Sequence, residues 1–147
     1  MANTNTLKTK VEPYVRDWLA TKFGRPFRSE FLTLSRVKNE PAEHEFDAVS
    51  EDRKIVCGIK TASWKTSGNK RGSGKIQGAY AEIYFLDHAD APEKYLVLTD
   101  KEFFDNLQRD IQGKLPPNTA LLYCELSDDL KREVNDVRAR SRRELGF

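Results

Sequence analysis

The sequence predicts an α/β (α+β) fold in which a mixed sheet is flanked by helices, within one domain spanning residues 1–147. The first observation is that stretches with helical spacing of apolar residues alternate with short, strand-like apolar runs, in the order α, β, β, β, α, β, α, β, α. The second is composition. With 38% hydrophobic and 33% charged side chains, 147 residues can form one buried core under a heavily charged surface.

The first half of the chain predicts one helix followed by three strands. Apolar residues recur at three- and four-residue spacing over residues 6–22, and Gly24 with Pro26 ends this helix. Pro13 either marks the first turn of a shorter helix or kinks a longer one. The expected strands are residues 31–37, 43–50 and 54–61, with a turn at 51–53 between the last two.

The second half predicts helices that alternate with buried strands. Residues 63–75 are rich in Gly, Ser and Asn and are expected to form a mobile loop. Ser127 is expected to cap the final helix, with Asp128 and Asp129 near its positive end. The remaining expected elements are helices over 76–88 and 101–112 and strands over 95–99 and 120–126.

Composition also excludes several classes of protein. No apolar run approaches the roughly 20 residues of a membrane-spanning helix, and the N-terminus MANTNTLKTK has no apolar signal core. We therefore expect a cytoplasmic protein without a membrane partner. Cys57 and Cys124 lie in apolar segments and are expected to be reduced and buried. His44 and His88 are too far apart in the sequence to indicate zinc spacing.

A basic segment occupies the middle of the chain. Between Arg53 and Ala81 there are seven basic residues and no acidic one, although the net charge of the whole chain is only +2. Such a block is typical of a protein that binds a phosphate backbone, and a solubilising loop is the alternative. The seven residues are Arg53, Lys54, Lys60, Lys65, Lys70, Arg71 and Lys75.

Acidic side chains and one lysine meet on the hairpin expected over residues 43–61. Glu43, Glu45 and Asp47 occupy alternate positions of its first strand and therefore share a face. Phe46 and Ala48 are expected to pack on the core with the apolar residues Ile55, Cys57 and Ile59 of the second strand. This packing places Asp47 and Lys60 together on the other face.

Two registers of the hairpin are open. In one, Asp47 lies opposite Gly58 and Lys60 is its diagonal neighbour, about 7–8 Å away. In the other, a two-residue turn at 51–52 places Glu45 opposite Gly58, where the missing side chain leaves room for a carboxylate. A carboxylate that binds a divalent ion, beside a lysine that orients water, is a usable pair for phosphodiester cleavage. An ordinary polar face with an exposed ion pair is the alternative.

With this order of elements, an aspartate on the second strand and IKT closing the third, the chain resembles the PD-(D/E)XK (restriction-endonuclease-like) nuclease superfamily over residues 7–99. The resemblance implies an αβββαβ core and hydrolysis of phosphodiester bonds in nucleic acid, above all DNA, with Mg²⁺ or Mn²⁺ as cofactor. By position it makes Asp47 a catalytic metal ligand, Lys60 the catalytic lysine and Glu12 the first-helix acid, with Asp17 as the alternative to Glu12.

The chain departs from the family motif at Gly58, where an acidic residue is expected two positions before the lysine. Under one interpretation catalysis is lost and a nucleic-acid-binding or scaffold module remains. Under another, Asp47, Glu12, water and the main-chain oxygen of Ile59 hold the metal.

Under a third interpretation the carboxylate has moved. Glu45 is the main candidate, as a catalytic and metal-binding residue, and Glu82 on the following helix is a weaker one. A site completed between two copies, in a homodimer, is a further alternative.

The basic segment supplies the expected contacts with nucleic acid. Trp64 either stacks on a base or sugar or anchors the loop to the core. Gln77, on the next helix, would face the site if the family layout holds. The expected phosphate contacts are Lys65, Lys70, Arg71 and Lys75.

Overall fold

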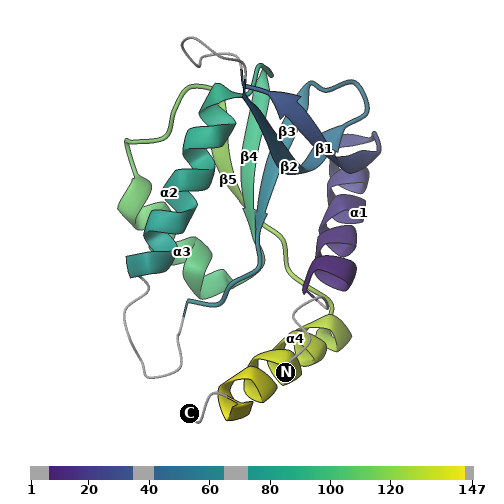
Figure 1. The fold of residues 1–147 in the computed structure, drawn as a ribbon, viewed down its shortest axis with the longest axis vertical. Coiled ribbons are helices and arrows are strands. Elements are labelled where there is room, and N and C mark those ends of the chain that lie inside the picture. The colour runs from purple at the N-terminus through teal and green to yellow at the C-terminus, as the bar shows by residue number, and fades with distance from the viewer. Residues whose placement is uncertain (1–6, 35–41, 65–72, 145–147) are drawn as a thin grey trace.

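The computed structural model describes residues 7–34, 42–64 and 73–144. Its strands form a five-stranded sheet in the order β1-β2-β3-β4-β5 (Figure 1). They are β1 (Phe27–Thr33), β2 (Glu43–Ser50), β3 (Ile55–Lys60), β4 (Glu93–Leu98) and β5 (Thr119–Tyr123). Pairing is antiparallel from β1 to β3 and parallel from β3 to β5, so the sheet is mixed, as predicted.

Helices cover both faces of this sheet. Figure 1 shows α2 and α3 on one side and α1 on the other, while α4 extends away from the strands. The helices are α1 (Glu12–Phe23), α2 (Ser73–His88), α3 (Lys101–Ile111) and α4 (Asp128–Glu144). The order of elements, including αβββαβ from α1 to β4, confirms the prediction.

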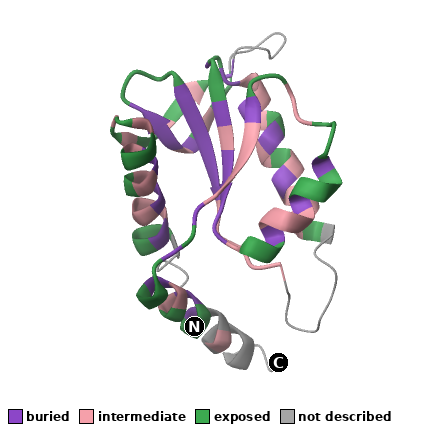
Figure 2. Cartoon of the chain, turned by 180° about the vertical axis from the view of Figure 1, so that it is seen from behind, coloured by how far each residue is buried: buried purple, intermediate pink, exposed green. Residues whose placement is uncertain are grey.

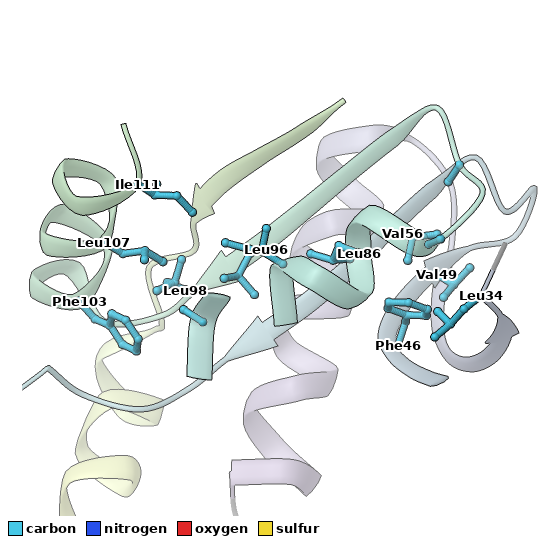
Figure 3. Close-up of a cluster of buried hydrophobic side chains, with 14 residues drawn as sticks. Leu34, Phe46, Val49, Val56, Leu86, Leu96, Leu98, Phe103, Leu107 and Ile111 are labelled. Atoms are coloured by element: carbon cyan, nitrogen blue, oxygen red, sulfur yellow. The ribbon is translucent and has the colours of Figure 1, made fainter. Parts of the chain in front are cut away.

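The sheet separates two hydrophobic clusters, and the central strands are buried between them (Figure 2). The cluster on the α2 and α3 side includes Phe46, Val49, Val56, Leu86, Leu98 and Phe103 (Figure 3). The cluster on the α1 side includes Val15, Leu19, Ala48, Cys57, Ile59 and Val97. Because β3 is covered on both faces, its residues form a continuous apolar run rather than an alternating one. Cys57 and Cys124 are buried free thiols, as expected.

Several boundaries differ from the prediction. β1 spans Phe27–Thr33 rather than residues 31–37, because it pairs with the whole of β2, from Ser50 to Glu43. α2 begins at Ser73, so the end of the loop expected over 63–75 is helical. Residues 35–41 and 65–72 lie outside the described part of the chain.

Pro13 divides the first predicted helix. A π-helical turn over Leu7–Val11 ends just before α1, and Pro13 lies in the first turn of α1, which is the first of the two predicted arrangements. Proline cannot donate the main-chain hydrogen bond that would continue the preceding turn. At the other end of the chain, Ser127 Oγ accepts a hydrogen bond from Leu130 N at 3.3 Å and caps α4 as predicted.

Candidate functional site

β2 and β3 separate at the residues that the sequence singles out. The two strands pair at Ala48↔Cys57 and Val49↔Val56, and continuing this register places Asp47 opposite Gly58. Four residues, 51–54, connect the strands. The two-residue turn that would place Glu45 opposite Gly58 is therefore wrong. Beyond Asp47, β2 continues toward Glu43 as the partner of β1.

A bulge in β2 coincides with this separation. Arg28 pairs with Val49 and Glu30 with Phe46, so Asp47 and Ala48 together lie opposite Ser29. The bulge interrupts the alternation of side chains. Phe46 packs with the α2-side cluster and Ala48 with the α1-side cluster, so the prediction that these two residues share a face is wrong.

Asp47 is held at the point of separation. Its Oδ2 accepts a hydrogen bond from Ile59 N at 2.8 Å, so the side chain takes the place of a main-chain acceptor for β3. Burial raises the pKa of the Asp47 carboxyl, whereas the Ile59 N–H and the charges of Arg16 and Lys60 lower it. A half-buried acid is thus placed where two cations partly compensate its charge.

Glu82 of α2 fills the space left by Gly58. A Cβ built on Gly58 would stand 2.8 Å from Glu82 Cγ and 2.9 Å from Glu82 Oε1. The carboxylate from the helix therefore lies against the strand position where the family motif has its acid. Burial and the Asp47 charge raise the pKa of Glu82, while His44 and Lys60 lower it.

His44 supports Glu82 from β2. Its Nε2 lies 3.6 Å from Glu82 Oε1. The imidazole stacks on Phe85 with ring centroids 4.0 Å apart and contacts Phe46 edge-on at 4.8 Å. These rings fix the orientation of His44 beside the carboxylate. Sequence reasoning missed this role, because Glu82 lies on a later helix and no spacing in the sequence links it to His44.

Lys60 lies at the end of β3 beneath α2. Its Nζ is 4.0 Å from the point that a Cβ on Gly78 would occupy, so this second glycine gives the ammonium room against the helix. Within the described residues, Lys60 has no carboxylate at ion-pair distance. Its charge nevertheless lowers the pKa of both Asp47 and Glu82. The three side chains therefore share one electrostatic environment.

The remaining acidic candidates approach from other directions. Glu12 on α1 forms an ion pair with Arg16, with 3.3 Å between Oε1 and Nη2. Burial and the Asp47 charge raise the pKa of Glu12. Glu45 is exposed on β2 opposite Phe31. Asp17 is exposed on α1.

The structure describes some of the residues expected to contact nucleic acid. Trp64 anchors the segment after β3: its main-chain N–H donates to Asp100 Oδ2 at 3.0 Å, and its indole ring lies 5.9 Å from the ring of Phe103. Lys75 Nζ donates to the main-chain oxygens of Ser63 and Trp64, which links the first turn of α2 to the segment after β3. Gln77 is exposed on α2. Lys65, Lys70 and Arg71 lie outside the described residues.

The donor atoms at this site suit a hard divalent cation. Mg²⁺ is usually held by one or two carboxylates, with water and substrate phosphate completing its coordination. Asp47 and Glu82 supply two carboxylates of this kind, and the charge of Asp47 helps to raise the pKa of Glu82. Among the described residues, no group of three or more His, Cys, Asp or Glu side chains is arranged to hold a metal ion.

Comparison with known proteins gives no relative: the chain matches no family model, no curated protein and no solved structure. Over the described residues, no helix is long and apolar enough to cross a membrane.

Proposed function

We propose that the protein is a metal-dependent nuclease that hydrolyses phosphodiester bonds in nucleic acid, with DNA as its substrate and Mg²⁺ or Mn²⁺ as its cofactor. The observation that carries this proposal is the position of Glu82, whose carboxylate stands against Gly58 beside Asp47 and Lys60. An acid contributed by a helix thereby replaces the acid missing from the strand. The αβββαβ order of elements supports the same resemblance to the PD-(D/E)XK nucleases.

The proposed roles follow from chemistry and position. Asp47 and Glu82 would hold the ion, and a bound divalent ion supplies Lewis acidity toward the phosphate and makes water a better nucleophile. Lys60 would donate hydrogen bonds to a phosphate oxygen or to the attacking water, and would stabilise the negative charge that develops in the transition state. Burial strengthens these interactions, because charges act more strongly where water is excluded.

One observation favours a second function. Gly58 leaves the strand without the acid of the family motif. A module that binds nucleic acid without cleaving it would need no such acid. A homodimer in which a second copy adds a ligand would also account for this observation, and the mass of the protein in solution tests it.

A cleavage assay separates these functions. The protein is incubated with single- and double-stranded DNA and RNA in Mg²⁺, in Mn²⁺ or in chelator. We expect cleavage of DNA that requires the metal and that falls by about 100-fold or more in each of Glu82→Gln, Asp47→Asn and Lys60→Met. Salt-sensitive DNA binding without cleavage under any condition would instead support the binding module.

Two variants serve as matched controls. Glu45→Gln removes the other candidate for the displaced acid, which is exposed, and Lys114→Met removes an exposed lysine outside the basic segment. Both variants should cleave at close to the wild-type rate. If Glu45→Gln lost activity while Glu82→Gln kept it, the assignment of Glu82 would be wrong.

A further inference from the structure

We infer that Arg16 is a positioning residue, which fixes Asp47 by holding its main-chain carbonyl, and that Glu12 serves the site by orienting Arg16. Arg16 Nε donates to Asp47 O at 2.8 Å, and Arg16 Nη2 lies 3.3 Å from Glu12 Oε1. This inference rests on the proposed function insofar as it concerns catalysis. The geometric part, that Arg16 determines where Asp47 lies, stands without it.

The backbone around Asp47 departs from regular strand pairing. A bulge places both Asp47 and Ala48 opposite Ser29, and β2 leaves β3 at the same point. A bulged residue is left out of the regular ladder, and a partly buried carbonyl without a donor is costly. Arg16 supplies that donor from another element.

Arg16 reaches the main-chain carbonyl of Asp47 from α1. Arg16 lies one helical turn after Glu12, and its side chain is only 21% exposed. The guanidinium is a rigid fork whose several N–H groups can serve two acceptors at once. One arm of the fork meets Asp47 O and another meets Glu12, so the Glu12 carboxylate fixes the direction of the group that holds Asp47.

These contacts restrict both the main chain and the side chain of Asp47. Arg16 of α1 holds the main-chain carbonyl, and the Ile59 N–H of β3 holds the side-chain Oδ2. Asp47 is thus held at both ends, between a helix and a strand. Of the two carboxylate oxygens of Asp47, only Oδ2 accepts a hydrogen bond from the described residues. Oδ1 is therefore left for a cation or a substrate. Without Arg16 the bulge would lose one of its two anchors.

The chain contains a matched control for this arrangement. Arg25 also donates through Nε to a main-chain carbonyl, that of Phe23 at 3.3 Å, and through Nη1 to a carboxylate, that of Asp52 at 2.8 Å. This second arginine anchors the segment between α1 and β1 and makes no contact with Asp47. Arg16→Gln and Arg25→Gln therefore each remove a hydrogen bond to a main-chain carbonyl and an ion pair with a carboxylate, at two different places in the fold.

The test uses a readout that does not depend on catalysis. Hydrogen exchange at the Ile59 amide reports the bond to Asp47 Oδ2 in the 147-residue chain. We expect Arg16→Gln to speed exchange at Ile59 by about tenfold or more relative to Cys57 of the same strand, whereas Arg25→Gln leaves this ratio unchanged. Should Arg16→Gln fail to fold, Arg16→Lys, which keeps the charge but not the fork, is expected to move the ratio in the same direction.

Cleavage assays then separate the effect of Arg16 on catalysis from its effect on the position of Asp47. If wild-type protein cleaves DNA, Arg16→Gln should lower kcat more than it raises KM, since Arg16 acts through Asp47 and not on the substrate. If wild-type protein does not cleave, the proposed function fails while the Ile59 ratio still tests Arg16. An unchanged ratio at Ile59 in both folded Arg16 variants would overturn the inference whatever the activity.

Discussion

Gly58 and Glu82 are sterically complementary. Gly58 has no positive φ that would demand glycine. The reason for glycine lies instead in its neighbour, because a Cβ at this position would stand 2.8 Å from Glu82 Cγ. A carboxylate can therefore come from the helix rather than the strand, provided that the strand residue has no side chain of its own.

This arrangement predicts a coupling between the two positions. In a strand, Gly→Ala normally stabilises or is neutral, because alanine loses less entropy on folding. At Gly58 we expect Ala to destabilise the protein by about 1–3 kcal/mol, as overpacking does. In a Glu82→Ala background the same change should be close to neutral. Urea denaturation of the four proteins measures the coupling energy, and additive effects would contradict the steric explanation.

The elements themselves were largely predictable from local pattern. The alternation of Glu43–Ser50 predicted the bounds of β2 as observed, and the apolar run Ile55–Ile59 identified a strand, although the burial of both its faces was not predicted. The start of β1 was not predictable in this way. Phe27 is strand because it pairs with Ser50, and that partner is chosen by the tertiary fold.

The site was predictable only in part. Asp47 and Lys60 follow from position on neighbouring strands, whereas the bulge at Asp47 leaves no sign in a sequence whose alternation continues through it. Glu82 was named as a weaker candidate, since its approach to Gly58 depends on how α2 docks on the sheet. Arg16 was missed altogether, because its partner is a main-chain carbonyl and carries no sequence signal.

Asp100 joins α3 to the segment after β3. Asp100 Oδ2 accepts hydrogen bonds from Phe103 N, as the cap of α3, and from Trp64 N, each at 3.0 Å. Asp100→Ala should destabilise the protein by about 1–2 kcal/mol, and Asp100→Asn, which keeps an acceptor, by less. Denaturation gives the stability, and exchange at the Trp64 amide should be faster in Asp100→Ala.

The cap of α4 is the control for that prediction. Ser127→Ala removes a single, longer capping bond, of 3.3 Å, to Leu130 N. It should weaken α4 without changing exchange at Trp64. If Ser127→Ala and Asp100→Ala affected Trp64 equally, Asp100 would not be the specific link between the two segments.

On the scale of the whole molecule, the fold gathers acids that the sequence keeps apart. Glu12, Asp47 and Glu82 come from α1, β2 and α2, and burial raises the pKa of each of them. An acid whose pKa is raised by folding stabilises the native state below its unfolded pKa, and this contribution is lost as the pH rises through the folded pKa. The site therefore works against the fold at neutral pH, which is expected where function requires concentrated charge.

The charge of Glu82 is expected to lower the stability of the protein at neutral pH. Glu82→Gln should be more stable than wild type at pH 7, and the difference should shrink as the pH falls and the wild-type carboxyl takes up its proton. Mg²⁺ or Mn²⁺ should reverse the order, since an ion that binds only the native state stabilises it by about 2.7 kcal/mol at a concentration 100 times its Kd. Glu102→Gln, an exposed change on α3, should behave as wild type in both respects. Thermal denaturation across pH, with and without the ion, measures each effect. A Glu82→Gln protein that the ion stabilises as much as wild type would show that this carboxylate is not where the metal binds.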